Sequence, residues 1–160
     1  MTTNKRTAWA WVTGTFFGLG LMKPGPGTWG SAAAMLLWMA YANWTHAAIN
    51  MLTLATFIAA GVALAIGIPA ASVVARECGS GDPQVVVIDE AVGQWIALLG
   101  LPPTWGHAIL ALLFFRLFDI LKPPPARQFD RMHGGFGIMM DDVAAGIYAF
   151  ICMQIVHIFY

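Results

Sequence analysis

The sequence predicts an all-α fold, a polytopic helical bundle that crosses a membrane. Two observations carry this prediction. Of the 160 residues, 59% are hydrophobic and 10% are charged, whereas soluble domains average about 45–50% apolar and about 25% charged residues. Apolar runs of helical length also recur along the chain, and polar stretches separate them. Because neither an internal repeat nor a shift in composition divides the chain, we expect one domain over residues 1–160.

The composition argues against nucleic-acid binding and against a disulfide or metal site built on cysteine. The formal net charge is zero, whereas a nucleic-acid-binding protein needs a basic face to meet the phosphates. The two cysteines, Cys78 and Cys152, are far apart, and neither has a C-x-x-C partner or a histidine at metal-ligand spacing. We therefore predict no nucleic-acid partner, no disulfide and no cysteine-based metal site.

The first apolar run, Thr7–Met22, follows Lys5 and Arg6 and superficially matches a signal peptide. No small-x-small cleavage site follows the run, so we expect it to remain in the mature protein. Three glycines interrupt it between Ala8 and Leu21, and it is short for a membrane span. An interfacial or re-entrant position is the expectation, and the tryptophans of the run suit a membrane interface.

Proline and glycine keep the next stretch, Leu21–Ser31, from forming a regular helix. Residues 25–30 match G-x-G-x-x-G, but no βαβ unit surrounds them, so the match does not indicate a dinucleotide site. Thr28 or Ser31 is expected to cap the following helix, whose N-terminus attracts phosphate. Lys23 adds a positive charge there. An ordinary capped helix after a turn is the alternative. The substrate-binding candidates here are Lys23, Gly27, Thr28 and Ser31.

Five apolar runs follow, and each is expected to be helical. They cover residues 32–41 and onward, 51–71, 85–100, 107–121 and 143–160. The first two form a helical hairpin around an uncharged turn at residues 43–50. A proline turn at residues 101–105 joins the third and fourth runs, and the triple proline Pro123–Pro125 ends the fourth. The last run is long enough to cross a membrane once.

The charged stretches are separated from one another by pairs of these apolar runs, and a pair of crossings returns a chain to the same side. The two turns at residues 43–50 and 101–105 carry neither Lys nor Arg. By the positive-inside rule, the charged side is cytoplasmic. The sequence therefore predicts a multi-pass protein of the bacterial inner membrane whose polar loops converge on the cytoplasmic face.

Half of the charge lies in one stretch, Phe114–Gly146. Eight of the sixteen charged residues fall there, and apolar sequence flanks them. Charge near a membrane costs free energy, so such clustering indicates a functional site, although surface loops also collect charge without chemistry. The charged residues are Arg116, Asp119, Lys122, Arg127, Asp130, Arg131, Asp141 and Asp142.

Six of the eight acids fall on the inferred cytoplasmic face: Asp89, Glu90, Asp119, Asp130, Asp141 and Asp142. Clustered carboxylates repel one another and need a cation, and oxygen ligands without cysteine select Mg²⁺ or Mn²⁺ over zinc. Mg²⁺ commonly shares its coordination between carboxylates and substrate phosphate. Basic phosphate binders are available in Lys23, Lys122, Arg127 and Arg131. Together they predict phosphoryl chemistry with a metal-activated water, since no covalent phosphatase motif is present.

Two further features have alternative interpretations. Arg116, Asp119 and Lys122 recur every three residues, so one helix face can present acid and base to a substrate; a salt-bridged helix end is the alternative. His133, in H-G-G-F-G, is a candidate general acid, although loop histidines more often serve hydrogen bonding. The glycines beside it allow close approach of the backbone to a ligand.

Five motifs are spread over nearly the whole chain: P-G-T-x-G-S at 26–31, D-E-x-x-G-x-W-I at 89–96, F-R-x-x-D-x-x-K-P at 115–123, F-D-R at 129–131 and H-G-G-x-G-I-M-x-D-D-x-x-A-G at 133–146. Together they resemble the phosphatidylglycerophosphatase A family of bacterial membrane lipid phosphatases. The resemblance implies a mainly helical fold and Mg²⁺-dependent hydrolysis of phosphatidylglycerophosphate to phosphatidylglycerol and phosphate. Pro124 stands where an aromatic residue is expected, a departure that concerns local lipid contact.

The resulting hypothesis places Mg²⁺ on Asp89, Glu90, Asp141 and Asp142. Lys122, Arg127 and the loop at residues 25–31 would hold the phosphate, and Asp119 and Asp130 would serve as ligands or bases. The main rival is a cation carrier or channel component, because intramembrane carboxylates also mark ion pathways. A lipid-headgroup transferase lacks its D-x-x-D-G-x-x-A-R pattern here, and a purely structural subunit leaves the acid cluster unexplained.

Overall fold

A computed structural model describes residues 6–132 and 134–159, and every regular element among them is helical. The all-α prediction is confirmed for this part of the chain. The elements are α1 (Ala8–Gly14), the short 3₁₀ turn η1 (Leu19–Leu21), α2 (Pro26–Thr45), α3 (Ile49–Cys78), α4 (Ile88–Ala97), α5 (Trp105–Leu121), α6 (Ala126–Asp130) and α7 (Gly135–Phe159).

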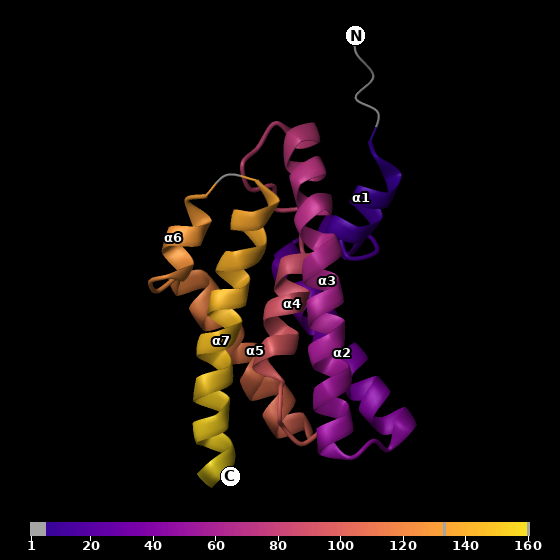
Figure 1. The fold of residues 1–160 in the computed structure, drawn as a ribbon, viewed down its shortest axis with the longest axis vertical. Helices are drawn as coiled ribbons and strands as arrows, with labels where there is room; N and C mark the ends of the chain where they lie inside the picture. Colours follow the sequence, from indigo (N-terminus) through magenta and orange to yellow (C-terminus); the bar gives the residue numbers. More distant parts are fainter. Residues whose placement is uncertain (1–5, 133, 160) are drawn as a thin grey trace.

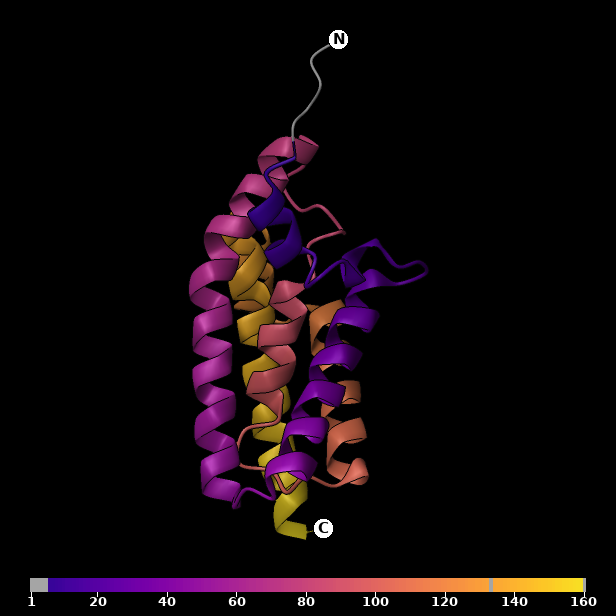
Figure 2. The same cartoon turned by 90° about the vertical axis from the view of Figure 1, so that its right-hand side faces the viewer.

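The helices form an elongated bundle around α4, which contacts α2, α3, α5 and α7 (Figures 1 and 2). The α2–α3 turn and the α4–α5 turn lie at the end of the bundle from which the C-terminus emerges, and the N-terminal segment lies at the opposite end (Figure 1). The predicted helical hairpin at α2 and α3 is therefore present. Its turn begins at His46, which ends α2 in the left-handed conformation.

Small residues let the central helix approach its neighbours closely. A Cβ atom on Gly93 of α4 would lie 2.2 Å from the Phe115 ring and 2.7 Å from the Asp142 carbonyl oxygen. A Cβ atom on Gly146 of α7 would lie 2.6 Å from the Gly93 carbonyl oxygen. The backbones of α4 and α7 therefore touch at this glycine pair, which brings the acid-bearing turns of the two helices together.

Two helices are long and apolar enough to cross a membrane, α3 and α7. Large apolar side chains on their outer faces remain exposed, including Phe57, Ile58 and Val62 on α3 and Ile151 and Ile155 on α7. Contiguous exposed apolar surface of this kind is typical of a lipid or protein contact. By length and composition, these two helices are the candidate membrane spans among the described residues.

Two predicted boundaries are wrong. Helix α2 begins at Pro26, with Gly25 as its N-cap and no side-chain cap, so Thr28 and Ser31 lie inside the helix instead of capping it. Proline suits the first helical position because the missing N–H has no partner there. Helix α7 begins at Gly135, well before the predicted start at Val143. Its N-terminal turn packs on α3, where Gly135 N donates to Ser72 Oγ over 2.9 Å.

The N-terminal segment is anchored by one carboxylate of α3. Glu77 accepts hydrogen bonds from the Thr7 backbone N (3.1 Å), the Thr7 hydroxyl (2.6 Å) and Trp11 Nε1 (2.7 Å). The run predicted to be interrupted by its glycines indeed stops at Gly14, and the chain turns back through left-handed Phe16, Phe17 and Gly18. Cys78 and Cys152 are both free, as predicted.

Candidate active site

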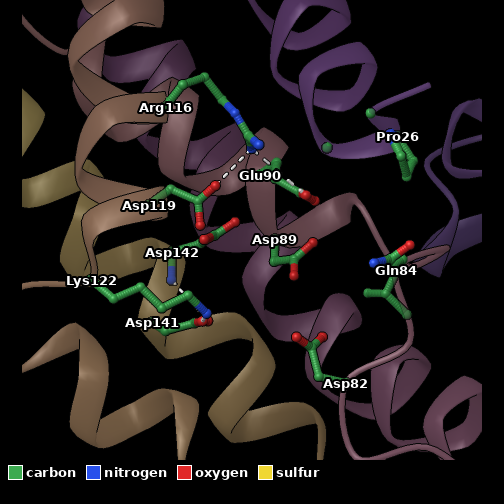
Figure 3. Close-up of a pocket in the computed structure, with 13 residues that line it drawn as sticks. Pro26, Asp82, Gln84, Asp89, Glu90, Arg116, Asp119, Lys122, Asp141 and Asp142 are labelled. Atoms are coloured by element: carbon green, nitrogen blue, oxygen red, sulfur yellow. Dashed lines mark hydrogen bonds and ion pairs between the residues drawn. The ribbon is translucent and has the colours of Figure 1, made fainter. Parts of the chain in front are cut away.

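A polar pocket of about 350 Å³ lies where the N-termini of α2 and α4 meet the C-terminal part of α5 and the first turns of α7 (Figure 3). Six carboxylates, two basic side chains and the start of α2 surround it. The lining residues are Gly25, Pro26, Gly27, Asp82, Gln84, Val86, Asp89, Glu90, Arg116, Asp119, Lys122, Asp141 and Asp142.

Three of the carboxylates form a compact group on two helices. Asp89 and Glu90 occupy the first turn of α4 and Asp142 lies on α7, and one oxygen from each lies within 4.8 Å of the others. One oxygen of each side chain is buried and has no hydrogen-bond partner: Asp89 Oδ1, Glu90 Oε2 and Asp142 Oδ2. We call these residues the acid triad. Buried like charges without partners are unfavourable unless a cation or protons compensate them.

The donor set of the acid triad fits a hard divalent cation. All three donors are carboxylate oxygens, the type that Mg²⁺ and Mn²⁺ prefer, and neither cysteine belongs to the group. The three residues also line a pocket with room for additional ligands. Mg²⁺ usually keeps part of its coordination for water or substrate phosphate, and this arrangement leaves space for both.

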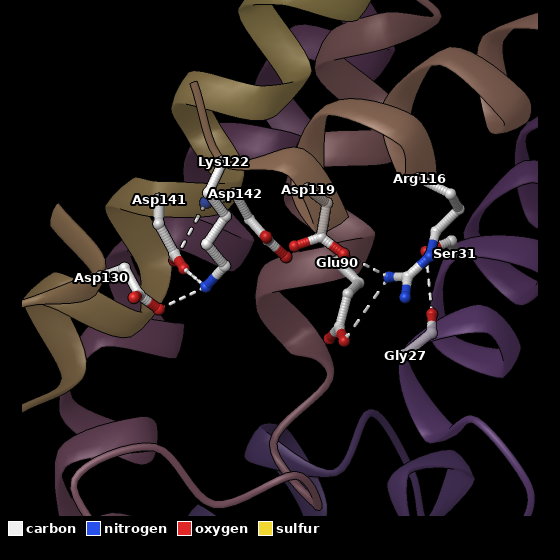
Figure 4. Close-up of polar contacts among 9 residues, drawn as sticks. All are labelled: Gly27, Ser31, Glu90, Arg116, Asp119, Lys122, Asp130, Asp141 and Asp142. Atoms are coloured by element: carbon white, nitrogen blue, oxygen red, sulfur yellow. Dashed lines mark hydrogen bonds and ion pairs between the residues drawn. The ribbon is translucent and has the colours of Figure 1, made fainter. Parts of the chain in front are cut away.

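Asp141, adjacent to the acid triad, contacts Lys122 instead. Its Oδ2 lies 2.6 Å from Lys122 Nζ, and its Oδ1 accepts a hydrogen bond from the Asp142 backbone N over 3.0 Å. Asp130 contacts the same ammonium group (Figure 4). Burial alone would lower the pKa of Lys122, but the two carboxylates outweigh it and raise the pKa, so the side chain stays charged.

Arg116 is the second basic group of the pocket. Its Nη1 lies 2.7 Å from Asp119 Oδ2 and 3.8 Å from Glu90 Oε1 (Figure 4). The contact with Asp119 is not aligned as a hydrogen bond, and Nε and Nη1 are buried without a hydrogen-bond partner. The guanidinium is therefore held in place by acids while donors remain for a ligand. Arg116 and Asp119 thus form the salt-bridged helix end that was the alternative interpretation, and Lys122 lies one residue beyond the end of α5.

The N-terminus of α2 closes the pocket next to these groups. A Cβ atom at Gly27 would lie 2.1 Å from Glu90 Oε1 and 2.9 Å from Arg116 Nη1. Only a glycine permits this approach without displacing both side chains. The start of a helix presents free backbone N–H groups, which favour phosphate, and the pocket lies in front of them.

Other predicted site residues lie outside the pocket. Ser31 is buried within α2 and donates to the Gly27 carbonyl. Lys23, Thr28, Arg127 and Arg131 are exposed and do not line the pocket. Asp130 reaches the site only through Lys122. The position of His133 falls outside the described residues.

Two polar pocket residues were not among the sequence candidates, Asp82 and Gln84. They lie in the loop before α4, and Figure 3 shows them across the pocket from Arg116 and Asp119. Desolvation by burial raises the pKa of Asp82. The positive charge of Lys122 lowers this pKa, whereas the negative charges of Asp130 and Asp119 raise it further. The sequence signal was the proximity of the G-S-G-D-P turn to the Asp89–Glu90 pair, only a few residues further on.

Comparison with known proteins shows that the chain is similar to lipid phosphatases. Residues 12–157 match the model of the family described as phosphatidylglycerophosphatase A. A putative phosphatidylinositol-3-phosphatase of Bacteroides thetaiotaomicron is 39% identical over 90% of this chain and 91% of its own length. A phosphatidylglycerophosphatase A of Haemophilus influenzae is 39% identical over 84% of this chain and 80% of its own length. A phosphatidylglycerophosphatase A of Escherichia coli is 36% identical over 82% of this chain and 73% of its own length. No solved structure is significantly similar.

Proposed function

Because this chain belongs to the phosphatidylglycerophosphatase A family of lipid phosphatases, we propose that it hydrolyses phosphatidylglycerophosphate to phosphatidylglycerol and phosphate with the help of Mg²⁺. The observation that carries the proposal is the pocket, where the acid triad faces Arg116 and Lys122 across a space large enough for a phosphorylated headgroup. Two relatives are named for this activity. The Bacteroides relative is instead named for a phosphoinositide, phosphatidylinositol 3-phosphate.

In this proposal Asp89, Glu90 and Asp142 hold the cation. When bound, Mg²⁺ would neutralise charge on the phosphoryl oxygens and acidify the attacking water. The unpartnered oxygens of the three carboxylates support this assignment, because no hydrogen-bond donor among the described residues reaches them. Asp141 is not assigned to the cation, because its Oδ2 contacts Lys122 and its Oδ1 accepts a hydrogen bond from the Asp142 backbone N.

The remaining pocket groups bind and orient the phosphate monoester. Arg116 and Lys122 supply positive charge from the α5 side, and the backbone N–H groups at the start of α2 approach from the other. Asp119 and Asp130 fix the orientation of these two basic side chains. Fixed charges placed around a reacting phosphoryl group stabilise its transition state without reorganisation. Asp119, which lines the pocket, is also available as a base for the attacking water.

The proposal places α3 and α7 across the bacterial inner membrane and the pocket on the cytoplasmic side. Exposed apolar side chains on both helices support contact with lipid. Several described basic residues, among them Lys23, Arg76 and Lys122, lie near helix ends, whereas residues 43–50 and 101–105 carry neither Lys nor Arg. Such a distribution is typical of a protein oriented by the positive-inside rule.

The direct test is phosphate release by the purified protein in detergent micelles. Phosphatidylglycerophosphate, phosphatidylinositol 3-phosphate and phosphatidic acid with matched acyl chains would be compared, each with Mg²⁺ and with EDTA. We expect Mg²⁺-dependent release that is fastest from the first lipid. Preferred hydrolysis of the phosphoinositide would contradict the substrate assignment, and EDTA-resistant release would contradict the metal assignment. Folded protein that is inactive on all three lipids would leave the cation-pathway alternative favoured.

A further inference from the structure

The polar pocket is larger than the group on which the proposed chemistry acts. Its volume of about 350 Å³ corresponds to roughly a dozen water molecules at about 30 Å³ each, whereas a phosphate monoester has only five heavy atoms. In the proposed function, the phosphate and the cation occupy the part of the pocket formed by the acid triad, Arg116, Lys122 and the start of α2. Asp82 and Gln84 line the other side, where Figure 3 shows both side chains directed toward the pocket near Asp89.

Asp82 and Gln84 are unsuited to binding phosphate but well suited to binding hydroxyl groups. A carboxylate repels a phosphate dianion, and it accepts strong hydrogen bonds from hydroxyls. The Gln84 amide offers both a donor and an acceptor. Neither side chain makes a hydrogen bond within the part of the chain that the structure describes, so their polar atoms remain available for a ligand.

The loop that carries these two residues is fixed by its neighbours. Val86 N donates to the Pro83 carbonyl over 2.9 Å, and Val87 N donates to the Gly14 carbonyl over 2.8 Å. Pro83, Val86 and Val87 are buried, while Asp82 and Gln84 between and beside them are exposed to the pocket. The loop thus presents its two polar side chains from a packed base, and such preorganisation reduces the entropy lost on binding.

Resting on the proposed function, we infer that Asp82 and Gln84 form a headgroup subsite that binds hydroxyl groups of the polyol carrying the scissile phosphate. The subsite selects phospholipids whose phosphate monoester sits on a hydroxylated headgroup, such as a glycerol or an inositol. It disfavours phosphatidic acid, in which the phosphate is attached directly to diacylglycerol and no headgroup hydroxyl is present. The binding of a polyol here is separate from the phosphate-binding and cation-holding residues.

The test is the ratio of kcat/KM for phosphatidylglycerophosphate to kcat/KM for phosphatidic acid, in mixed micelles with identical acyl chains. The variants are Gln84→Leu, which keeps the side-chain volume and removes the amide, and Asp82→Asn, which removes the charge. We expect the ratio to fall about fivefold for Gln84→Leu and about tenfold for Asp82→Asn, since hydrogen bonds to charged groups contribute more. Gln128→Ala, at an exposed position of α6, is the matched control, and its ratio should stay within about twofold.

The outcomes separate this inference from the proposed function. A wild-type protein that hydrolyses phosphatidic acid as well as phosphatidylglycerophosphate, or variants that both keep the wild-type ratio, would overturn the subsite. A wild-type protein that releases phosphate from no lipid would instead overturn the proposed function. Because both positions are exposed, the variants are expected to fold, and size-exclusion chromatography in detergent verifies this. Using a ratio removes any general effect on turnover that the two substrates share.

Discussion

At the scale of single residues, burial of the three carboxylates of the acid triad is expected to lower the stability of the protein, while the proposed function depends on them. Three carboxylates from two helices are buried together, and each retains an oxygen without a partner. Substitution of one of them by its amide removes a charge and keeps the shape. The consequences for stability and for activity should therefore have opposite signs, as expected where a site is strained for function.

We predict that Asp142→Asn makes the metal-free protein more stable and nearly abolishes turnover. Removal of one of three clustered charges should raise Tm in EDTA by roughly 3 °C, equivalent to about 1 kcal/mol for a chain of this size. Mg²⁺ should raise the Tm of the wild-type protein, because a ligand that binds only the folded state stabilises it, and should leave Asp142→Asn unchanged. A variant that is still stabilised by Mg²⁺ to the wild-type extent would remove Asp142 from the cation site.

A second residue-scale prediction concerns Gly27. Its missing Cβ leaves room for Glu90 and Arg116, both of which can swing away at little cost because the contacting atoms are the ends of flexible side chains. Gly27→Ala should therefore fold normally while kcat/KM falls about a hundredfold, the scale associated with misplacing reacting groups by about 1 Å. Gly61→Ala is the matched control, because nothing lies within 4 Å of a Cβ atom there. Equal activities of the two variants would argue against close approach of α2 to the site.

At the scale of helices, the glycines of α4 and α7 determine where the acids meet. Gly93 follows Glu90 by one turn, Gly146 follows Asp142 by one turn, and their backbones are in contact. Neither glycine is required by a left-handed backbone conformation. They allow the two helices to approach closely enough that carboxylate oxygens from both lie within 4.8 Å of one another.

Gly146→Ala should disturb this contact in a way that Gly27→Ala does not. The added methyl group would meet the backbone of Gly93 at 2.6 Å, and a backbone cannot rotate away as a side chain can. We expect a loss of about 1–3 kcal/mol in stability from overpacking, measured as a Tm lower by roughly 5 °C, together with reduced activity. If Gly146→Ala kept the wild-type Tm, as the control Gly61→Ala is expected to do, α4 and α7 would be free to separate.

The limits of sequence reasoning are also visible at this scale. Apolar periodicity and length were sufficient for the helical class and for the α2–α3 hairpin, and the adjacent acids Asp89 and Glu90 identified the centre of the site. The start of α7 could not be predicted, because H-G-G-F-G and the Asp141–Asp142 pair have the composition of a loop. Only the packing of Gly135 against Ser72 of α3 explains a helix there. Whether Asp141 faces the acid triad or Lys122 likewise depends on tertiary contacts that local sequence does not encode.

At the scale of the whole molecule, the two ends of the bundle differ in chemistry. The pocket lies among the N-termini of α2, α4 and α7 and the C-terminal part of α5, and the basic residues 122, 127 and 131 lie close by in sequence. The opposite end holds the α2–α3 turn, the α4–α5 turn and the C-terminus (Figure 1). The histidines His107 and His157 meet each other there, with 3.1 Å between ring nitrogens. This polarity predicts an orientation in the membrane.

We predict that the pocket end faces the cytoplasm and that the α2–α3 turn faces the opposite side. Cys78 is exposed at the end of α3, and it serves as a native marker for the first side once Cys152 is replaced by serine. A His46→Cys change in a chain without Cys78 and Cys152 marks the second side, because His46 is exposed at the end of α2. A membrane-impermeant maleimide should label Cys78 in inverted inner-membrane vesicles but not in spheroplasts. It should label the His46→Cys variant in spheroplasts only. The reverse pattern would place the pocket outside the cytoplasm and contradict the predicted orientation. Labelling of both markers from one side would mean that α3 does not cross the membrane.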